Sequence, residues 1–219
     1  MNRELSGGIV GVVLAGGRSQ RMGGREKAFL ELAGQPMLAH IIGRFAPQVP
    51  RLAINANGDP ARFAAFGLPV FADTIPDYAG PLAGVLAGLR WVAAGSPRAT
   101  HMATVSSDAP LIPPDLVARL AAEAAEAGDA IVVAQSGGVV HPVTGLWPLG
   151  IADALERALA TGERRVQRWV ESQGMRTVAF PALELSGRTV DPFFNVNTPA
   201  EFSEVEALMQ LLERQKEQS

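Results

Sequence analysis

The sequence contains no cysteine and only three histidines among its 219 residues. Disulfides and thiolate metal sites are therefore excluded, and a zinc site is disfavoured because the histidines lie far apart along the chain. No G-x-S-x-G motif or cysteine nucleophile is present, which leaves acyl-transfer hydrolysis with little support. His141, which has no neighbouring ligand partner in the sequence, is expected to be structural.

Neither sign of charge is in large excess, since 19 Lys and Arg face 22 Asp and Glu and the net charge is −3. This balance gives no global attraction for a nucleic-acid polymer or an anionic membrane, so neither is expected as a partner. The apolar run near the start is too short to span a bilayer and lacks a signal-peptide cleavage pattern. We expect a soluble protein of the cytoplasm.

Hydrophobic residues make up 47% of the chain, and short apolar runs alternate with longer amphipathic ones. This order is typical of an α/β fold in which crossover helices cover both faces of a mostly parallel sheet. Strands are predicted over Ile9–Leu14, Arg51–Ala56, Val70–Ala72, Met102–Ser106, Ala130–Ala134 and Arg176–Phe180. Helices are predicted over Met37–Phe45, Pro60–Phe66, Pro81–Ala94, Pro114–Ala127, Ile151–Ala160, Glu163–Gln173 and Pro199–Arg214. We expect one domain over residues 1–205, followed by a polar helix end or tail over residues 206–219.

The segment after the first predicted strand combines glycines with Arg21 and Lys27. Glycine lets backbone N–H groups approach an oxyanion, and Arg and Lys add charge-assisted bonds to phosphate. The backbones of Gly16-Gly17 and Gly23-Gly24 are therefore candidates for holding a triphosphate, although the segment matches neither G-x-x-x-x-G-K-[ST] nor G-x-G-x-x-G. The alternative is a mobile, solvated surface loop.

Other polar residues follow the next predicted strands, where ligands collect in open α/β sheets. They are Asn55, Asp73 and Asp108. A carboxylate at Asp108 suits Mg²⁺, which takes one or two carboxylates plus phosphate oxygens; alone, this aspartate would more simply cap a turn. The small residues of Gly80–Gly84 could bring a helix start close to a ligand or serve close packing.

The motifs LAGG-x3-RMGG-x2-K, NAN, ADTIPDYAGPLAG, a strand ending in D-x-P, HPVTGLW, GERRV and FFNVNTPAEF occur in this order. Together they make the chain resemble bacterial molybdenum cofactor guanylyltransferase, the MobA family. The correspondence covers roughly residues 9–205, whereas the opening motif alone indicates only the wider nucleotidyltransferase superfamily. Departures are Glu26, where the family usually has Asp, and Ser107, where it often has Cys; neither removes a phosphate or metal ligand.

The resemblance implies a three-layer, Rossmann-like α/β/α fold that uses GTP and Mg²⁺ to attach GMP to molybdenum-bound molybdopterin. It implies GTP contacts at Leu14, Ala15, Gly16, Lys27, Asn55, Asp73 and Asp108. Gly17 and Gly24 belong to the same nucleotide-binding set, Asp108 would also hold the metal, and Asn195 and Asn197 match pterin-side positions. Proteins that deliver the pterin and chaperones of molybdoenzymes are implied as partners.

A phosphate monoester is already anionic near neutral pH, so its attack on the α-phosphate of GTP needs no general base. Catalysis then requires positioning and charge neutralisation, which we assign to Lys27, Arg21 and the Asp108-bound metal. The backbone of Leu14–Gly16 and the Asn55 amide are the candidates for choosing the base.

A related enzyme that transfers CMP, or one acting on a sugar or polyol phosphate, is the alternative; Asn195 and Asn197 argue against it. A non-catalytic nucleotide-binding adaptor is a second alternative, and the presence of both Lys27 and Asp108 opposes it.

Overall fold

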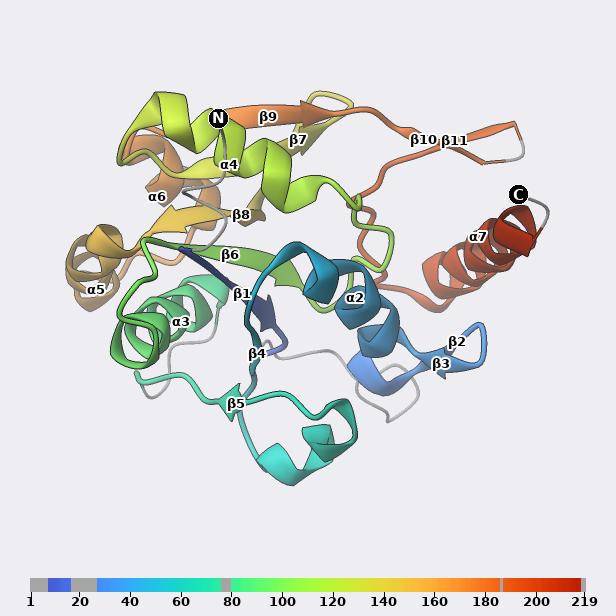
Figure 1. Cartoon of the computed structure of the whole chain (residues 1–219), viewed down its shortest axis with the longest axis horizontal. Helices are drawn as coiled ribbons and strands as arrows, with labels where there is room; N and C mark the ends of the chain where they lie inside the picture. Colours follow the sequence, from blue (N-terminus) through green and yellow to red (C-terminus); the bar gives the residue numbers. More distant parts are fainter. Residues whose placement is uncertain (1–7, 17–26, 76–79, 186, 218–219) are drawn as a thin grey trace.

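The computed structural model describes residues 8–16, 27–75, 80–185 and 187–217. A seven-stranded sheet with strand order β5-β4-β1-β6-β8-β7-β9 lies at its centre (Figure 1). Its strands are β1 (Ile9–Leu14), β4 (Leu52–Asn55), β5 (Val70–Phe71), β6 (His101–Ser106), β7 (Val132–Ser136), β8 (Val139–Pro148) and β9 (Arg176–Phe180). β8 runs antiparallel to both of its neighbours, whereas the other strands share one direction. The mostly parallel sheet predicted from the sequence is thus confirmed.

Helices cover both faces of this sheet. They are α2 (Met37–Phe45), α3 (Pro81–Gly95), α4 (Leu116–Ala127), α5 (Ala152–Ala160) and α6 (Val166–Ser172), while α7 (Pro199–Glu217) lies beside the sheet. The chain also forms short 3₁₀ helices, which are η1 (Lys27–Phe29), η2 (Ala46–Gln48), η3 (Pro60–Phe66) and η4 (Leu149–Ile151). The buried residues of α2, α4 and α7 belong to one apolar cluster, and those of α3, α5 and α6 to a second cluster. The molecule is therefore a three-layer α/β/α fold.

The first strand shows why the sheet has two cores. Ile9 and Val13 of β1 lie in the cluster with α2, while Val10, Val12 and Leu14 lie in the cluster with α3. Successive side chains of a strand point to opposite faces, so a continuous apolar run is buried on both sides. β1 consequently sits in the middle of the molecule, and its carboxyl end is held rigidly where a ligand can reach it.

Two differences between the prediction and the structure have a clear physical cause. Pro60–Phe66 forms the 3₁₀ helix η3, which is capped by the Asp59 side chain and ended by Gly67 at φ +64°. The strand β8 was not predicted, because Pro142 interrupts its apolar pattern and proline cannot donate to a strand ladder. Proline is tolerated here because the β7–β8 register shifts between Val133 and Ala134, which leaves the segment around Pro142 outside regular pairing.

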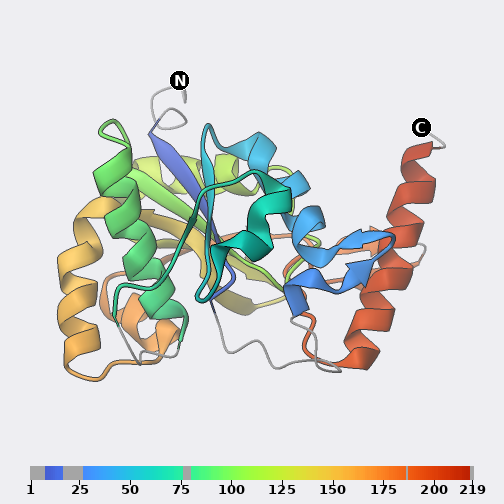
Figure 2. The ribbon, with the colours of Figure 1, turned by 90° about the horizontal axis from the view of Figure 1, so that it is seen from below.

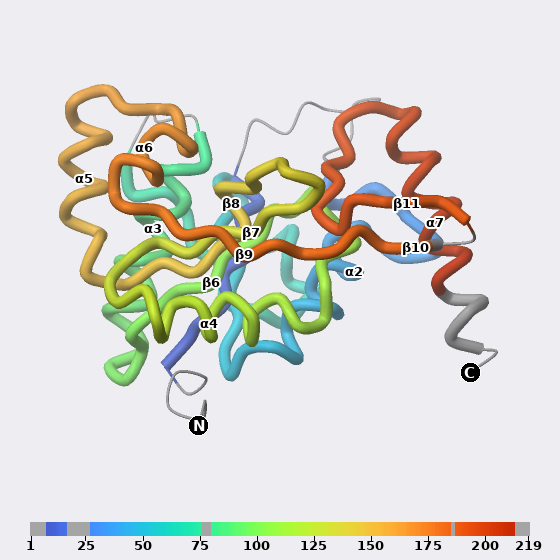
Figure 3. The backbone as a smooth tube through the Cα atoms, turned by 90° about the horizontal axis from the view of Figure 1, so that it is seen from above, coloured from blue at the N-terminus to red at the C-terminus, as the bar shows by residue number. Residues whose placement is uncertain are grey.

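A smaller assembly lies beside the sheet. It consists of α7, the β2–β3 hairpin (Glu31–Leu32 and Gln35–Pro36) and the β10–β11 hairpin (Leu183–Leu185 and Arg188–Val190), which Figure 1 shows together at one end of the molecule. Figure 2 shows β2–β3 next to α7, and Figure 3 shows β10–β11 at the same helix; both hairpins contact it. α7 passes residue 205 without a break, and Leu208 and Met209 beyond it are buried. No helix among the described residues is long and apolar enough to cross a bilayer.

Candidate active site

A pocket of about 460 Å³ opens at the carboxyl ends of the central strands. The ends of β1, β4 and β6 meet there with the first turn of α3 and with single residues from η1, β8 and the segment before α7. Its lining consists of Leu14, Ala15, Gly16, Lys27, Asn55, Gly80, Pro81, Gly84, Ser106, Ser107, Asp108, Val143 and Asn197. This is the place where open α/β sheets bind ligands.

The end of β1 supplies backbone to this pocket. The Ala15 N–H donates to the Asn55 carbonyl at 2.8 Å, and the Ser107 N–H donates to the Leu14 carbonyl at 3.1 Å. These two bonds hold the strand end between its neighbours on either side. Gly16 follows, and a Cβ there would lie 3.0 Å from Asn55 Oδ1, so only glycine leaves the amide in place without displacement. The backbone at this edge is therefore both fixed and close to the pocket.

The glycine-rich motif of the sequence continues beyond Gly16 into residues 17–26. Gly17, Arg21 and Gly24, predicted from the sequence to hold the triphosphate, lie outside the residues that the structure describes.

Asn55, at the end of β4, is buried and only 1% exposed. Its amide Nδ2 donates to Asp73 Oδ1 at 3.0 Å and lies 3.4 Å from the Phe71 carbonyl. A Cβ on Gly84, in the first turn of α3, would overlap Asn55 Oδ1. The small residues at the start of α3 thus serve a close approach to the pocket wall. Asp73 lies behind Asn55 and is not one of the lining residues.

Asp108 follows β6 and reaches the opposite side of the pocket. The Ser106 hydroxyl donates a short hydrogen bond to Asp108 Oδ1, and the Asp108 carbonyl accepts the N–H of Val196 at 2.9 Å. One of these bonds holds the Asp108 carboxylate and the other holds its backbone, so both parts of the residue are fixed. No group of three or more His, Cys, Asp or Glu that could enclose a metal occurs among the described residues. Asp108 provides one hard oxygen ligand, which suits a cation that draws its other ligands from phosphate and water.

Lys27 begins η1 and is 8% exposed, which is unusual for lysine. Its ammonium Nζ donates to Asn197 Oδ1 at 2.8 Å. Asn197 lies just before α7, so a residue near the first strand meets one near the last helix. The sequence had placed Lys27 with the triphosphate and Asn197 with the pterin; the structure puts the two side chains in direct contact within one pocket. Asn195, predicted with Asn197, is exposed and does not belong to the lining among the described residues.

The start of α7 holds Asn197 in place. Glu201 Oε2 accepts the N–H groups of Asn197 and Thr198, both at 2.7 Å, and the Thr198 hydroxyl accepts the Glu201 N–H at 3.2 Å. This reciprocal pattern is a capping box. The N–H of Asn197, followed by the bonds from Thr198, lowers the pKa of the Glu201 carboxyl, and the charge of Lys27 acts in the same direction. The sequence had predicted only that a helix begins at Pro199.

The bulged part of β8 adds a wall that sequence reasoning missed. Val143 lines the pocket, and its carbonyl accepts the Thr104 hydroxyl at 2.6 Å. Thr104 Oγ1 in turn accepts the Trp147 indole N–H at 2.7 Å. The buried β6 threonine thus fixes the bulge from behind. The HPVTGLW motif was visible in the sequence, but nothing in it indicated which residue faces a ligand.

His141, at the other end of the bulge, packs on the Phe193 ring with centroids 4.9 Å apart. Its Nε2 lies 3.4 Å from Asp191 Oδ2 but makes no hydrogen bond. Burial lowers the pKa of His141, and the charge of Asp191 opposes that shift. His141 therefore joins β8 to the segment that leads to Asn197.

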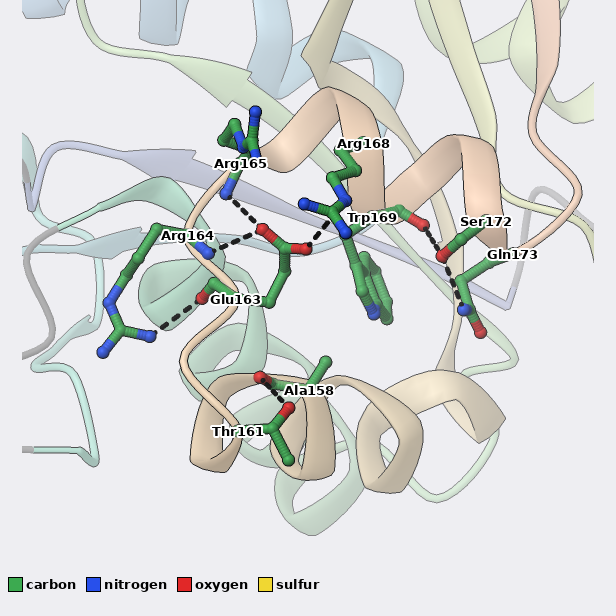
Figure 4. Close-up of polar contacts among 9 residues, drawn as sticks. All are labelled: Ala158, Thr161, Glu163, Arg164, Arg165, Arg168, Trp169, Ser172 and Gln173. Atoms are coloured by element: carbon green, nitrogen blue, oxygen red, sulfur yellow. Dashed lines mark hydrogen bonds and ion pairs between the residues drawn. The ribbon is translucent and has the colours of Figure 1, made fainter.

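The GERRV motif forms the entry to α6 (Figure 4). Glu163 Oε1 accepts the N–H groups of Arg164 and Arg165, both at 2.9 Å, and Glu163 Oε2 lies 3.6 Å from Arg168 Nε. The backbone N–H of Arg165, then that of Arg164, lowers the pKa of Glu163. None of these residues lines the pocket within the described part of the chain.

Comparison with known proteins identifies the family of the chain. The model of the MobA-like NTP transferase domain matches residues 11–178. A molybdenum cofactor guanylyltransferase of Bradyrhizobium sp. is 45% identical over 98% of this chain and 99% of its own length. One from Rhodopseudomonas palustris (strain BisB5) is 48% identical over 90% of this chain and 92% of its own length.

Solved structures share the fold. Molybdopterin-guanine dinucleotide biosynthesis protein A of Archaeoglobus fulgidus has a TM-score of 0.69 at 22% identity, covering 92% of this chain and 98% of its own. A CMP:2-keto-3-deoxy-manno-octonic acid synthetase complexed with CTP has a TM-score of 0.64 at 16% identity, with the same two shares of 92% and 98%. The family model covers most of the chain, and relatives of high identity match it nearly from end to end. The chain therefore belongs to the family of MobA-like NTP transferase domains.

Proposed function

We propose that the protein transfers GMP from GTP to the terminal phosphate of molybdenum-bound molybdopterin and releases pyrophosphate. The relatives named molybdenum cofactor guanylyltransferase, which match nearly the whole chain, support this reaction. The observation that carries it is the convergence of Lys27, Asn55 and Asp108 on one pocket at the sheet edge. A cation, an amide and a carboxylate placed there match the phosphates, the base and the metal of a nucleoside triphosphate.

The nucleoside side of the pocket is assigned to the ends of β1 and β4. Backbone groups of Leu14, Ala15 and Gly16 and the side chain of Asn55 offer fixed donors and acceptors to a purine edge. Asp73 holds the Asn55 amide and completes this wall from behind. Because these groups are held by neighbouring strands, they need little rearrangement when the base binds.

The triphosphate is assigned to Lys27, together with Arg21 and the backbones of Gly17 and Gly24. The Lys27 ammonium is already directed into the pocket by Asn197. A divalent metal on Asp108, which we propose to be Mg²⁺, would neutralise charge on the phosphates during transfer. The donor set fits that ion, because one carboxylate with phosphate oxygens and water satisfies Mg²⁺ without an enclosing protein cage.

The acceptor side is assigned to the segment before α7, which carries Asn195 and places Asn197 in the pocket. The attacking phosphate of molybdopterin is already anionic, so no side chain has to remove a proton from it. Lys27, Asn197 and Asp108 then act by aligning the two phosphates and balancing their charge. Partner proteins that deliver the pterin or receive the product, and a location in the cytoplasm, stay predictions of the sequence.

Incubation of the purified protein with Mg²⁺, molybdenum-bound molybdopterin and each nucleoside triphosphate in turn tests this function. The dinucleotide and pyrophosphate should form with GTP and not with CTP. Product from CTP alone would favour the related cytidylyl transfer, and no product from any nucleotide would refute the proposed reaction.

A further inference from the structure

Asn57 lies just outside the pocket lining but contacts Asp73 through both of its side-chain groups. Its amide Nδ2 donates to Asp73 Oδ2 at 2.8 Å, and its Oδ1 accepts the Asp73 backbone N–H at 2.9 Å. The two residues therefore form a closed ring of hydrogen bonds. The Asn57 carbonyl is held in turn by Arg62 Nη2 at 3.0 Å, so the ring is anchored to the start of η3.

This ring controls the direction in which Asn55 faces. Asp73 Oδ1 accepts the Asn55 Nδ2 group, while Asp73 Oδ2 accepts Asn57 Nδ2. Since a carboxylate and the nearby Phe71 carbonyl can only accept, the Asn55 NH₂ must point towards them. Asn55 Oδ1 consequently points towards Gly16 and Gly84, whose missing Cβ atoms leave room for it.

The result is an acceptor wall, by which we mean Asn55 Oδ1 at the pocket lining with the Asp73 carboxylate behind it. A carboxylate has about four lone-pair sites, and the two amides occupy two of them. An edge that offers only acceptors is complementary to adjacent donors on a base. Guanine presents such donors at N1–H and the 2-amino group, whereas cytosine and adenine place an acceptor next to their single amino group.

We propose that Asn57 is the positioning residue that sets the acceptor wall and thereby determines recognition of the guanine 2-amino group. This inference rests on the proposed use of GTP. Asn57 acts through Asp73 and Asn55 and does not touch the base itself. Its amide fixes the carboxylate, the carboxylate fixes the Asn55 amide, and the Asn55 oxygen is left to face the nucleotide.

Inosine triphosphate, which lacks the 2-amino group, is the probe for this role. The wild-type protein should use GTP with a kcat/KM about tenfold higher than that for inosine triphosphate, the size expected for one hydrogen bond. In Asn57→Asp the acceptor Oδ1 is retained, but a carboxylate faces Asp73 and the donor is lost. The ratio between the two nucleotides should then fall about fivefold or more, with a raised KM for GTP and a kcat within about twofold of wild type.

Asp59→Ala is the matched control in the same loop. It removes the bond from the Ala61 N–H to Asp59 Oδ1, which is 2.9 Å long, without touching Asp73. It should lower thermal stability and leave the nucleotide ratio unchanged. Asn57→Ala, which loses both bonds to Asp73, should change the ratio in the same direction as Asn57→Asp.

Calorimetric titration of each protein with GTP and inosine triphosphate provides a readout that needs no turnover. A nucleotide ratio that stays at the wild-type value in both Asn57 variants would overturn the inference, as would equal use of the two nucleotides by the wild-type protein. The comparison of GTP with inosine triphosphate on the wild-type protein can be made even where a variant does not fold. Failure of the wild-type protein to form product with GTP refutes the proposed function instead, so the two outcomes are distinguishable.

Discussion

The two halves of the sheet contribute to the pocket in different ways. The parallel half, β5-β4-β1-β6, supplies residues directly at its strand ends, such as Leu14, Asn55 and Ser106. The other half supplies Val143 from a bulge in the antiparallel strand β8, and Asn197 comes from the segment before α7. In the parallel half, regular strand geometry positions the site residues. Val143 and Asn197 are positioned instead by specific hydrogen bonds that involve side chains.

The comparison of the two halves predicts that the residues most important for turnover lie on the parallel half. The substitution Asp108→Ala is expected to have the largest effect. Loss of the carboxylate should lower kcat about 10³-fold, the upper end of what one charge-stabilising group contributes. The fold should survive, because the Asp108 backbone carbonyl still accepts the Val196 N–H. Steady-state kinetics and circular dichroism measure both effects. Asp115→Ala, at the exposed start of α4, is the control that should keep wild-type turnover; turnover by Asp108→Ala at the wild-type rate would contradict the metal assignment.

Gly84→Ala tests how tightly the parallel half is built around Asn55. The new Cβ would overlap Asn55 Oδ1, which is buried and cannot move away without losing its bond to Asp73. The KM for GTP should rise about tenfold or more, because the misplaced amide no longer meets the base. Gly43→Ala on α2, where a Cβ meets nothing within 4 Å, should leave the KM unchanged. An unaltered KM in Gly84→Ala would show that the close approach has no role in nucleotide binding.

Thr104→Val probes the junction of the two halves. It removes the hydroxyl that accepts the Trp147 N–H and donates to the Val143 carbonyl, and so leaves one buried and one partly buried group without this partner. The free energy of unfolding should fall by about 2–6 kcal/mol, at about 1–3 kcal/mol for each unpaired group. Chemical denaturation measures this loss, and Thr104→Ser, which keeps the hydroxyl, should recover most of it. Equal stability of the valine and serine variants would mean that packing alone fixes the bulge.

Glu201→Gln should have the smallest effect and should depend on pH. The pKa of Glu201 is lowered in the folded protein, so its stabilising contribution is full above the usual value near 4.5 and is lost as the pH falls through the lower folded value. The melting temperature of the variant should lie below that of wild type at about pH 7, and the gap should narrow progressively as the pH is lowered below 4.5. Glu204→Gln, exposed on the same helix, serves as the control. A gap that persists in acid would assign the difference to something other than the charge.

Sequence reasoning was accurate where local patterns determine structure. β1, β9 and α2 have the bounds predicted for them, since apolar periodicity and flanking residues are enough to define each element. The rule that residues following parallel strands share one edge also placed Gly16, Asn55 and Asp108 together, and the structure brings them to one pocket, whereas Asp73 from the same prediction is not part of its lining. Their chemical roles stay proposals.

The rest depends on contacts between distant segments. β8 escaped prediction because Pro142 is acceptable only where a bulge removes it from the ladder, and a bulge is not visible in the pattern. Val143 follows from the same bulge. Asn57 was visible only as part of the NAN motif, because its partner Asp73 is brought near by the β4–β5 pairing. Asn195 and Asn197 look alike in sequence, yet only Asn197 meets Lys27 in the structure.

The bond between Lys27 and Asn197 joins positions 170 residues apart, and this separation has a consequence in time. At the roughly 5–20 residues per second of ribosomal synthesis, Asn197 is made about 10–30 s after Lys27. β1, β4 and β6 can pair in that interval, but the bond between Lys27 and Asn197 cannot form until the start of α7 has emerged. A nascent chain can therefore assemble the strand ends that line the pocket before it forms this bond across the pocket.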